Sequence, residues 1–133
     1  MSQPTVAEYA VARLSKLGIT DCFGIPGDYA FPINDAITSS KSIHWLGCSN
    51  ELNASYAADG YARVRGASML CTTYGVGELS ALCGVMGAKA ERSTVFHLVG
   101  MSSMRNQHLR KVVHHTLGDG VFQNFNNISA QSA

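Results

Sequence analysis

The sequence predicts an open α/β fold, with a mainly parallel, doubly wound sheet that carries helices on both faces. Three observations carry this prediction. Four short apolar segments alternate with segments of helical periodicity, as βα units do. The four segments are apolar almost throughout, which is typical of parallel strands buried on both faces. Each is followed by glycine or polar residues, and 133 residues are enough for one such domain.

The first half of the chain supplies two strands and three helices. Thr5 and Glu8 form a capping box before apolar residues at helical spacing, and Gly18 supplies a left-handed stop, so a helix is predicted over residues 6–17. The segments that follow are a strand at 22–25, a turn at 26–28, a short helix at 31–37, a strand at 43–46 and a long helix at 50–65.

The second half repeats this alternation and then weakens. A strand is predicted at 69–73, a glycine-bearing helix at 77–90 and a fourth strand at 94–99. Residues 102–113 have a fainter helical pattern, and 118–133 are predicted to be loop or tail. Because ligands of open parallel sheets bind beyond the carboxyl ends of the strands, the polar residues that follow the strands are the candidate site.

Composition excludes several classes of protein. The net charge is +1 and no Lys/Arg-dense stretch occurs, which argues against a nucleic-acid ligand or a polybasic membrane anchor. No apolar run is long enough to span a bilayer and no secretory signal is visible, so a cytoplasmic protein is predicted. Only 14% of residues are charged, against about 25% in typical domains. This low proportion suggests that much of the surface contacts other protein.

The cysteines and histidines do not form a metal-binding motif. The four cysteines lie in apolar segments without a CxxC pair, and in a cytoplasmic chain they are predicted to be reduced core residues: Cys22, Cys48, Cys71 and Cys83. His108, His114 and His115 are spaced by six and one, which is not a zinc-ligand spacing on a helix. No metal site is predicted in this chain.

Two carboxylates and a histidine pair are candidates for chemistry. Asp28 and Glu51 follow two strands and should reach the same edge of the sheet; each could equally be a turn residue or a first-turn helix acid. His114 and His115 could transfer protons near neutral pH, or could simply be part of a polar loop.

Glycines precede the fourth helix in the run Gly75-Val76-Gly77. As a dinucleotide-binding fingerprint this run is weak, because Ser80 stands where the third glycine would be and no acidic residue follows the next strand. The alternative is that these glycines let a ligand or another backbone approach closely.

Four segments together resemble the N-terminal domain of thiamine diphosphate-dependent 2-oxo acid decarboxylases. They are FGIPGDY at 23–29, NELNASYAADGYAR at 50–63, TTYGVGELSA at 72–81 and HHTLGDG at 114–120. The resemblance covers nearly the whole chain in order. The run WLGCSNE at 45–51 leans slightly towards the indolepyruvate members over the pyruvate members of that family.

The resemblance implies a pyrimidine-binding domain over residues 1–117, followed by the start of a connection at 118–133. Glu51 matches the glutamate that hydrogen-bonds N1′ of the cofactor's aminopyrimidine and favours its imino tautomer, and a dry crevice would suit that role. Thr73, Gly75 and Val76 match the loop that lies against this ring. Asp28, His114 and His115 match residues proposed to relay protons to the enamine that remains after carbon dioxide has left, and to help release the aldehyde.

The family binds the diphosphate and magnesium in a separate C-terminal domain, through Gly-Asp-Gly and a distant Asn-Asn pair. Here Asn126-Asn127 follow Gly118-Asp119-Gly120 too closely for that motif, so the magnesium ligands are expected outside this chain. The resemblance implies a homo-oligomer (dimer or tetramer) or a complementary diphosphate-binding domain as partner, and inactivity of the chain alone. The alternative is a truncated, non-catalytic homologue that docks on a complete enzyme.

Overall fold

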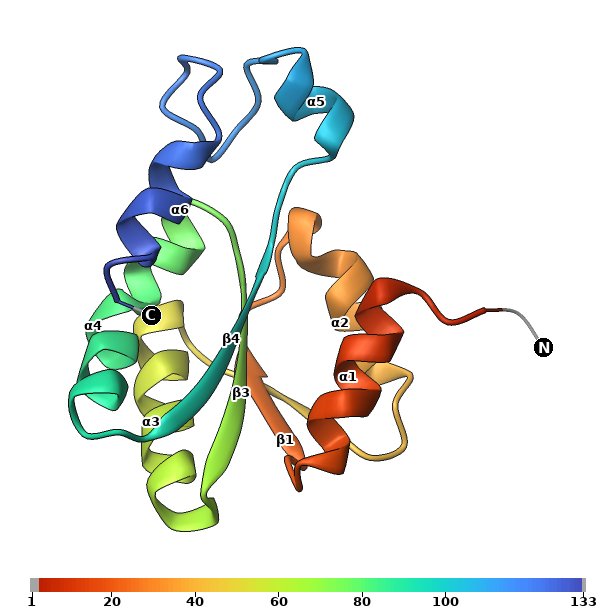
Figure 1. The fold of residues 1–133 in the computed structure, drawn as a ribbon, viewed down its shortest axis with the longest axis vertical. Coiled ribbons are helices and arrows are strands. Elements are labelled where there is room, and N and C mark those ends of the chain that lie inside the picture. The colour runs from red at the N-terminus through yellow and green to blue at the C-terminus, as the bar shows by residue number, and fades with distance from the viewer. Residues whose placement is uncertain (1–2, 133) are drawn as a thin grey trace.

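The computed structural model describes residues 3–132 and contains a four-stranded parallel sheet between two helical layers (Figure 1). The strand order is β2-β1-β3-β4, with bounds β1 Asp21–Gly24, β2 His44–Gly47, β3 Ala67–Thr73 and β4 Thr94–Gly100. From β1 the chain passes to the adjacent strand β2 on one side, and then crosses over to β3, which is adjacent to β1 on the other side. The predicted doubly wound α/β fold is confirmed.

One face of the sheet is covered by α1 (Val6–Lys16) and α2 (Phe31–Thr38) (Figure 1). The capping box at the start of α1 is present: the Glu8 amide donates to Thr5 Oγ1 at 3.2 Å and the Thr5 amide donates to Glu8 Oε2 at 2.7 Å. A short 3-10 turn, η1 (Asp28–Ala30), leads from β1 into α2. The core on this face combines apolar residues of both helices with alternate strand residues, among them Val11, Ile37, Met69 and Cys71.

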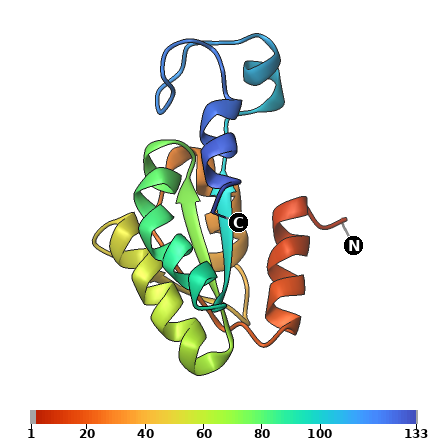
Figure 2. The same ribbon diagram turned by 60° about the vertical axis from the view of Figure 1, so that its left-hand side comes forward.

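The opposite face is covered by α3 (Glu51–Arg65) and α4 (Val76–Ala90), which run side by side in both views (Figures 1 and 2). Leu70 lies between Met69 and Cys71 in β3, and its side chain packs on this second face because successive strand residues point to opposite sides. Small residues let the two helices pack closely on the sheet: Ala54, Ala58 and Ala81 are fully buried.

The C-terminal part differs from the prediction in two ways. The predicted helix at 102–113 is wrong in extent, because only α5 (Met104–His108) is helical and Leu109–Arg110 already turn out of it. The prediction of loop throughout 118–133 is also wrong, because α6 (Gln123–Ser129) forms and packs beside α4. Its fold is stabilised by Phe122 and Phe125, which are buried against Tyr74. The division at residue 117 stays a prediction.

The four cysteines are unpaired thiols, but not all belong to the core. Cys22 and Cys71 are buried, and burial raises the pKa of the Cys71 thiol to about 12. Cys48 is half-buried and packs against the core, whereas Cys83 is exposed on α4, so the prediction of a core cysteine is wrong for Cys83. The reason for Cys83 is its place on a helix face directed away from the sheet. Within residues 3–132, no helix has the length and apolar character needed to cross a bilayer.

Candidate functional site

The predicted site residues gather where the parallel strands end. Asp28 opens η1 just after β1, Glu51 is the first residue of α3 after β2, and Thr73 is the last residue of β3. Gly75 and Val76 begin α4 immediately after Thr73. The loop that carries the two histidines extends from α5 over this same end of the sheet (Figures 1 and 2).

A first set of residues, here called the Glu51 group, consists of Glu51, Thr73 and Gly77. Asn50 fixes the start of α3, because its side chain accepts a 2.8 Å hydrogen bond from the Asn53 amide. A Cβ atom placed on Gly77 would lie 3.0 Å from Glu51 Oε1 and 3.0 Å from Thr73 Cγ2. The glycine therefore lets the carboxylate and the threonine meet on its two sides.

Both polar side chains of the Glu51 group lack partners. Within residues 3–132, Thr73 Oγ1 is the one buried side-chain nitrogen or oxygen without a hydrogen bond. The carboxylate of Glu51 likewise makes no hydrogen bond or ion pair to any residue of the described chain, and it is half-buried rather than enclosed. A buried hydroxyl without a partner costs free energy, so Thr73 Oγ1 needs a physical reason, whereas the half-buried carboxylate of Glu51 is open to water or to a ligand.

A second set, here called the His114 group, consists of Asp28, Tyr29, His114 and His115. Asp28 Oδ2 lies 2.8 Å from His114 Nε2, and the Tyr29 hydroxyl lies 3.3 Å from His114 Nδ1. The two imidazole rings are 4.6 Å apart between centroids. The side chains of His114 and Asp28 are 56% and 49% exposed, so this group is open to solvent and to a substrate.

The electrostatics of Asp28 reflect its histidine partner. Partial desolvation raises the pKa of the carboxyl group, but the hydrogen bond and the positive charge of His114 outweigh this effect. The Tyr29 amide and the more distant His115 add to the lowering, and the net pKa of Asp28 is below its ordinary value. Asp28 is therefore ionised at neutral pH and can accept a proton from, or return one to, the adjacent imidazole.

The two groups are joined through the backbone around Tyr74 and Gly75. Tyr74 is fully buried, and its hydroxyl donates a 2.7 Å hydrogen bond to the carbonyl oxygen of His114. Gly75 has a φ of +66°, and a Cβ atom there would lie within van der Waals overlap of the His115 carbonyl. The close approach expected at this glycine is thus made by another stretch of backbone.

Three residues of the site were not singled out by the sequence. Tyr29 orients His114, Tyr74 anchors the histidine loop, and Glu78 accepts from the Gly75 amide at 2.9 Å and from Ser129 at 2.5 Å. Each stands in a segment where an apolar or capping role explains it equally well. The signal that could have revealed them is proximity in space, which sequence spacing does not carry.

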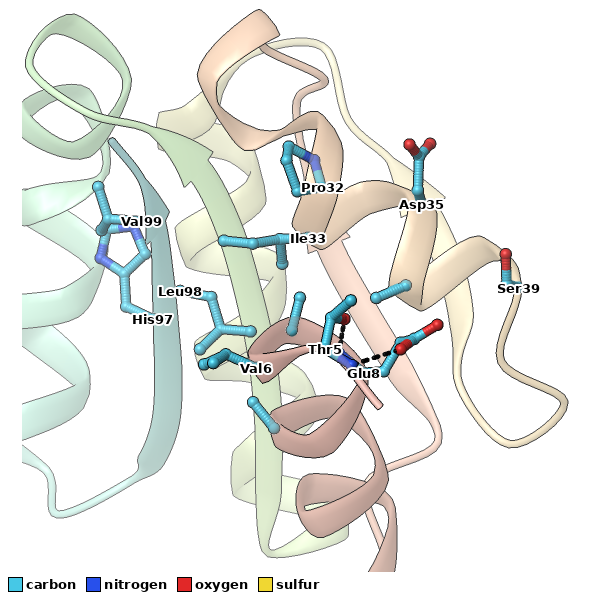
Figure 3. Close-up of a pocket in the computed structure, with 13 residues that line it drawn as sticks. Thr5, Val6, Glu8, Pro32, Ile33, Asp35, Ser39, His97, Leu98 and Val99 are labelled. Carbon is cyan, nitrogen blue, oxygen red and sulfur yellow. Dashed lines mark hydrogen bonds between the residues drawn. The ribbon is translucent and has the colours of Figure 1, made fainter. Parts of the chain in front are cut away.

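A separate groove of about 730 Å³ lies between α1, α2 and β4 (Figure 3). None of the predicted site residues lines it. Glu8 and Thr5 at its rim are engaged in the helix cap shown by dashed lines, and the walls are mainly apolar. The chemistry-bearing residues are therefore at the end of the sheet and not in this groove.

One protein family matches almost the whole chain. Residues 4–129 match the family described as thiamine pyrophosphate enzyme, N-terminal TPP binding domain. The chain belongs to this family. The match begins just before α1 and ends at the last residue of α6, and so includes every residue of the Glu51 and His114 groups.

The chain is similar to part of several longer proteins. Proteins named alpha-keto-acid decarboxylase from Mycobacterium leprae and Mycobacterium avium are each 49% identical over 127 residues. The counterpart from Mycobacterium tuberculosis is 47% identical over the same length. These alignments cover 96% of this chain but only 22–23% of the relatives, so the chain spans less than a quarter of their length.

The residues present fit the pyrimidine end of thiamine diphosphate. An aminopyrimidine offers ring nitrogens and an amino group, which can use an unpartnered carboxylate and an unpartnered hydroxyl at once. Glu51 supplies such a carboxylate, Gly77 leaves open the space beside it that a Cβ atom would fill, and the methyl group of Thr73 borders the same space.

Proposed function

We propose that this chain is the pyrimidine-binding part of a thiamine diphosphate-dependent 2-oxo acid decarboxylase of the indolepyruvate or pyruvate type. The observation that carries the proposal is the half-buried, unpartnered carboxylate of Glu51, which meets the Thr73 side chain at Gly77 where the strands end. The names of the 49%-identical relatives support the reaction class. The preference between the two substrates rests only on the sequence resemblance.

Glu51 is proposed to donate its carboxyl proton in a hydrogen bond to N1′ of the aminopyrimidine and to become a carboxylate as that ring nitrogen takes the proton. Its place at the first turn of α3 suits a carboxylate, because the helix dipole is positive there. Thr73, Gly75 and Val76 are proposed to lie against the same ring. When bound, the cofactor supplies the electron sink that lets a 2-oxo acid lose carbon dioxide.

Asp28, His114 and His115 are proposed to hold and move the proton that the product aldehyde requires. The 2.8 Å contact between Asp28 and His114 is short enough for direct transfer, and their exposure gives access to a substrate. Tyr29 holds His114 from the other ring nitrogen. Tyr29 is a positioning residue, because it acts through His114 and not on the substrate.

The partner is proposed to be a second copy or a complementary domain that contributes magnesium and the diphosphate site. Apolar side chains on the outer helices support an interface: Leu52 and Tyr56 lie one turn apart on α3, and both are exposed. The chain alone is then inactive, since it can hold only one end of the cofactor. We also propose a cytoplasmic location, in keeping with the unpaired thiols.

The test is the rate of decarboxylation of pyruvate and indolepyruvate by the assembled enzyme carrying Glu51→Gln. Loss of the carboxylate should lower the rate about 100- to 10,000-fold, because general acid–base chemistry of this kind contributes that much. Glu91→Gln is the matched control, since Glu91 is an exposed residue at the end of α4. Its rate should match the wild type.

A normal rate in the Glu51→Gln enzyme would contradict the proposed mechanism. The competing view, a docking homologue without catalysis, makes a different prediction. In that case the wild-type chain would form no active assembly, and adding it to a complete decarboxylase would lower the activity of that enzyme.

A further inference from the structure

The histidine pair lies with both rings on one side of its loop. Consecutive residues of an extended segment point to opposite sides, but His115 has a φ of +62°, in the left-handed region. The turn brings the two rings within 4.6 Å of each other. One nitrogen from each ring and an oxygen of Asp28 all lie within 4.8 Å of one another.

This arrangement is held by residues behind it. The Tyr29 hydroxyl at 3.3 Å from His114 Nδ1 leaves Nε2 directed at Asp28, and Tyr74 fixes the backbone carbonyl of His114. Histidine ligands of metal ions usually have their second nitrogen bonded in this way, which orients the ring. The donor atoms are therefore positioned before any ligand arrives.

We propose that Asp28, His114 and His115 form a binding site for a divalent transition metal, with Zn²⁺ as the ion that suits it best. Two imidazoles and one carboxylate are a common ligand set for zinc, which takes a water molecule as the fourth ligand. The spacing of the three histidines in the sequence did not indicate a metal site. In the structure His108 lies in α5, outside the cluster, and Asp28 is the third candidate ligand.

Only small movements are needed to accommodate the ion. In a tetrahedral site with bonds of about 2.0–2.1 Å the ligand atoms are roughly 3.4 Å apart. The contact between Asp28 and His114 must therefore open slightly from 2.8 Å, while the longer separations of at most 4.8 Å close. The exposed side chains of Asp28 and His114 leave an entry path from solvent and room for the water ligand.

The site goes beyond the proposed catalytic function. Binding of zinc by the chain needs neither thiamine diphosphate nor a partner domain, so it can be tested on the chain alone. Inhibition is a further consequence that does rest on the proposed function: an ion held by these three groups would block the proton transfer assigned to them.

The test is a titration of the 133-residue chain, without affinity tag, with ZnCl₂ by calorimetry, and with CoCl₂ by the visible absorption of tetrahedral Co²⁺. One ion should bind per chain. Asp28→Asn, His114→Gln and His115→Gln should each weaken zinc binding at least about tenfold, since even indirect supports of metal ligands are worth that much. Asp35→Asn and His108→Gln are matched controls on exposed residues and should leave affinity unchanged.

A second measurement uses the unaltered chain and does not depend on folding of the variants. The imidazole ¹⁵N resonances of His114 and His115 should move on addition of zinc, whereas those of His108 should not. Absence of saturable binding would overturn the proposal. So would binding that survives His114→Gln and His115→Gln, or binding that Cys83→Ser removes, because the exposed thiol would then be the ligand.

Discussion

The Glu51 group and the His114 group lie at the same end of the sheet, but they are built in opposite ways. Glu51 and Thr73 stand on a helix start and a strand end, packed around Gly77, and their polar atoms have no partners in the described chain. Asp28 and His114 stand on a 3-10 turn and a loop, are about half exposed, and bond to each other. The first set is rigid and unsatisfied, whereas the second is open and satisfied.

This difference indicates different roles. Polar groups without protein partners at a helix start and a strand end are available to a ligand that stays, and a partner for the buried Thr73 hydroxyl would remove its free-energy cost. A hydrogen-bonded pair on the surface can exchange protons with a ligand that comes and goes. These two features agree with a cofactor ring bound at the Glu51 group and a substrate bound at the His114 group.

The largest effect is expected at Gly75, which connects the two groups. Gly75→Ala places a Cβ atom against the His115 carbonyl and forces alanine into a left-handed conformation. Overpacking and the conformational cost together should lower the free energy of unfolding by about 3 kcal/mol. The measurement is urea denaturation of the chain followed by circular dichroism.

Gly18→Ala is the matched control. Gly18 has a φ of +87°, but no atom lies within 4 Å of where its Cβ would be. Only the conformational cost applies there, about 1 kcal/mol. Equal destabilisation by the two substitutions would mean that the histidine loop does not press on Gly75, and the link between the groups would be lost.

A smaller effect should distinguish the half-buried His97 from the exposed His114. His97 in β4 has its Nε2 2.9 Å from Thr72 Oγ1, and burial lowers the pKa of His97 to about 4 from the ordinary 6.5. The unfolded chain binds the proton more readily, so stability is full above pH 6.5 and falls as the pH drops towards 4. Between about pH 7.5 and about pH 5 the loss should be about 2 kcal/mol.

His97→Gln keeps a hydrogen-bonding group but no titration, so its stability should depend less on pH than that of the wild type over this interval. Urea denaturation at the two pH values measures the difference. His114→Gln is the control, because His114 is exposed and its pairing with Asp28 is screened by solvent. The assignment of the pH dependence to His97 is wrong if the stability of the His114 variant depends less on pH than that of the wild type while the stability of the His97 variant does not.

The fold could be predicted from the sequence because each strand is short and apolar and each helix carries local signals. The Thr5–Glu8 cap and the glycines after α1 and α3 act within a few residues, and pattern alone reveals them. Helix α6 could not be predicted, since Phe122 and Phe125 form it by packing on the distant Tyr74. The site residues divide in the same way, into those that sequence patterns reveal and those that only the folded structure brings together.

Glu51, Thr73 and Asp28 could be placed at one edge of the sheet, because parallel strands end together. Their partners could not be read from spacing. The hydroxyl of Tyr29 reaches His114 across 85 positions of sequence, and the hydroxyl of Tyr74 reaches the same residue across 40. The missing partner of Thr73 Oγ1 is also a property of the packed molecule.

The smallest expected effects concern two adjacent threonines: the hydroxyl of Thr72 has a hydrogen-bond partner, and the hydroxyl of Thr73 has none. Thr73→Val removes the buried hydroxyl that has no partner, so the chain should become more stable by about 1 kcal/mol. Thr72→Val removes a hydroxyl bonded to His97 and leaves the ring nitrogen without its partner, so it should cost about 1 kcal/mol or more. Urea denaturation near neutral pH measures both changes.

Whether Thr73→Val raises or lowers the free energy of unfolding decides whether the Glu51 group contains an unsatisfied hydroxyl. Val and Thr have nearly the same shape, so a gain in stability can only come from losing the unsatisfied hydroxyl. If Thr73→Val also weakens catalysis in the assembled enzyme, the chain carries this hydroxyl for the ligand and at the expense of its own stability. If Thr73→Val destabilises the chain as Thr72→Val does, the hydroxyl already has a partner, such as a bound water molecule. The Glu51 group would then be as satisfied as the His114 group, and the contrast between them would disappear.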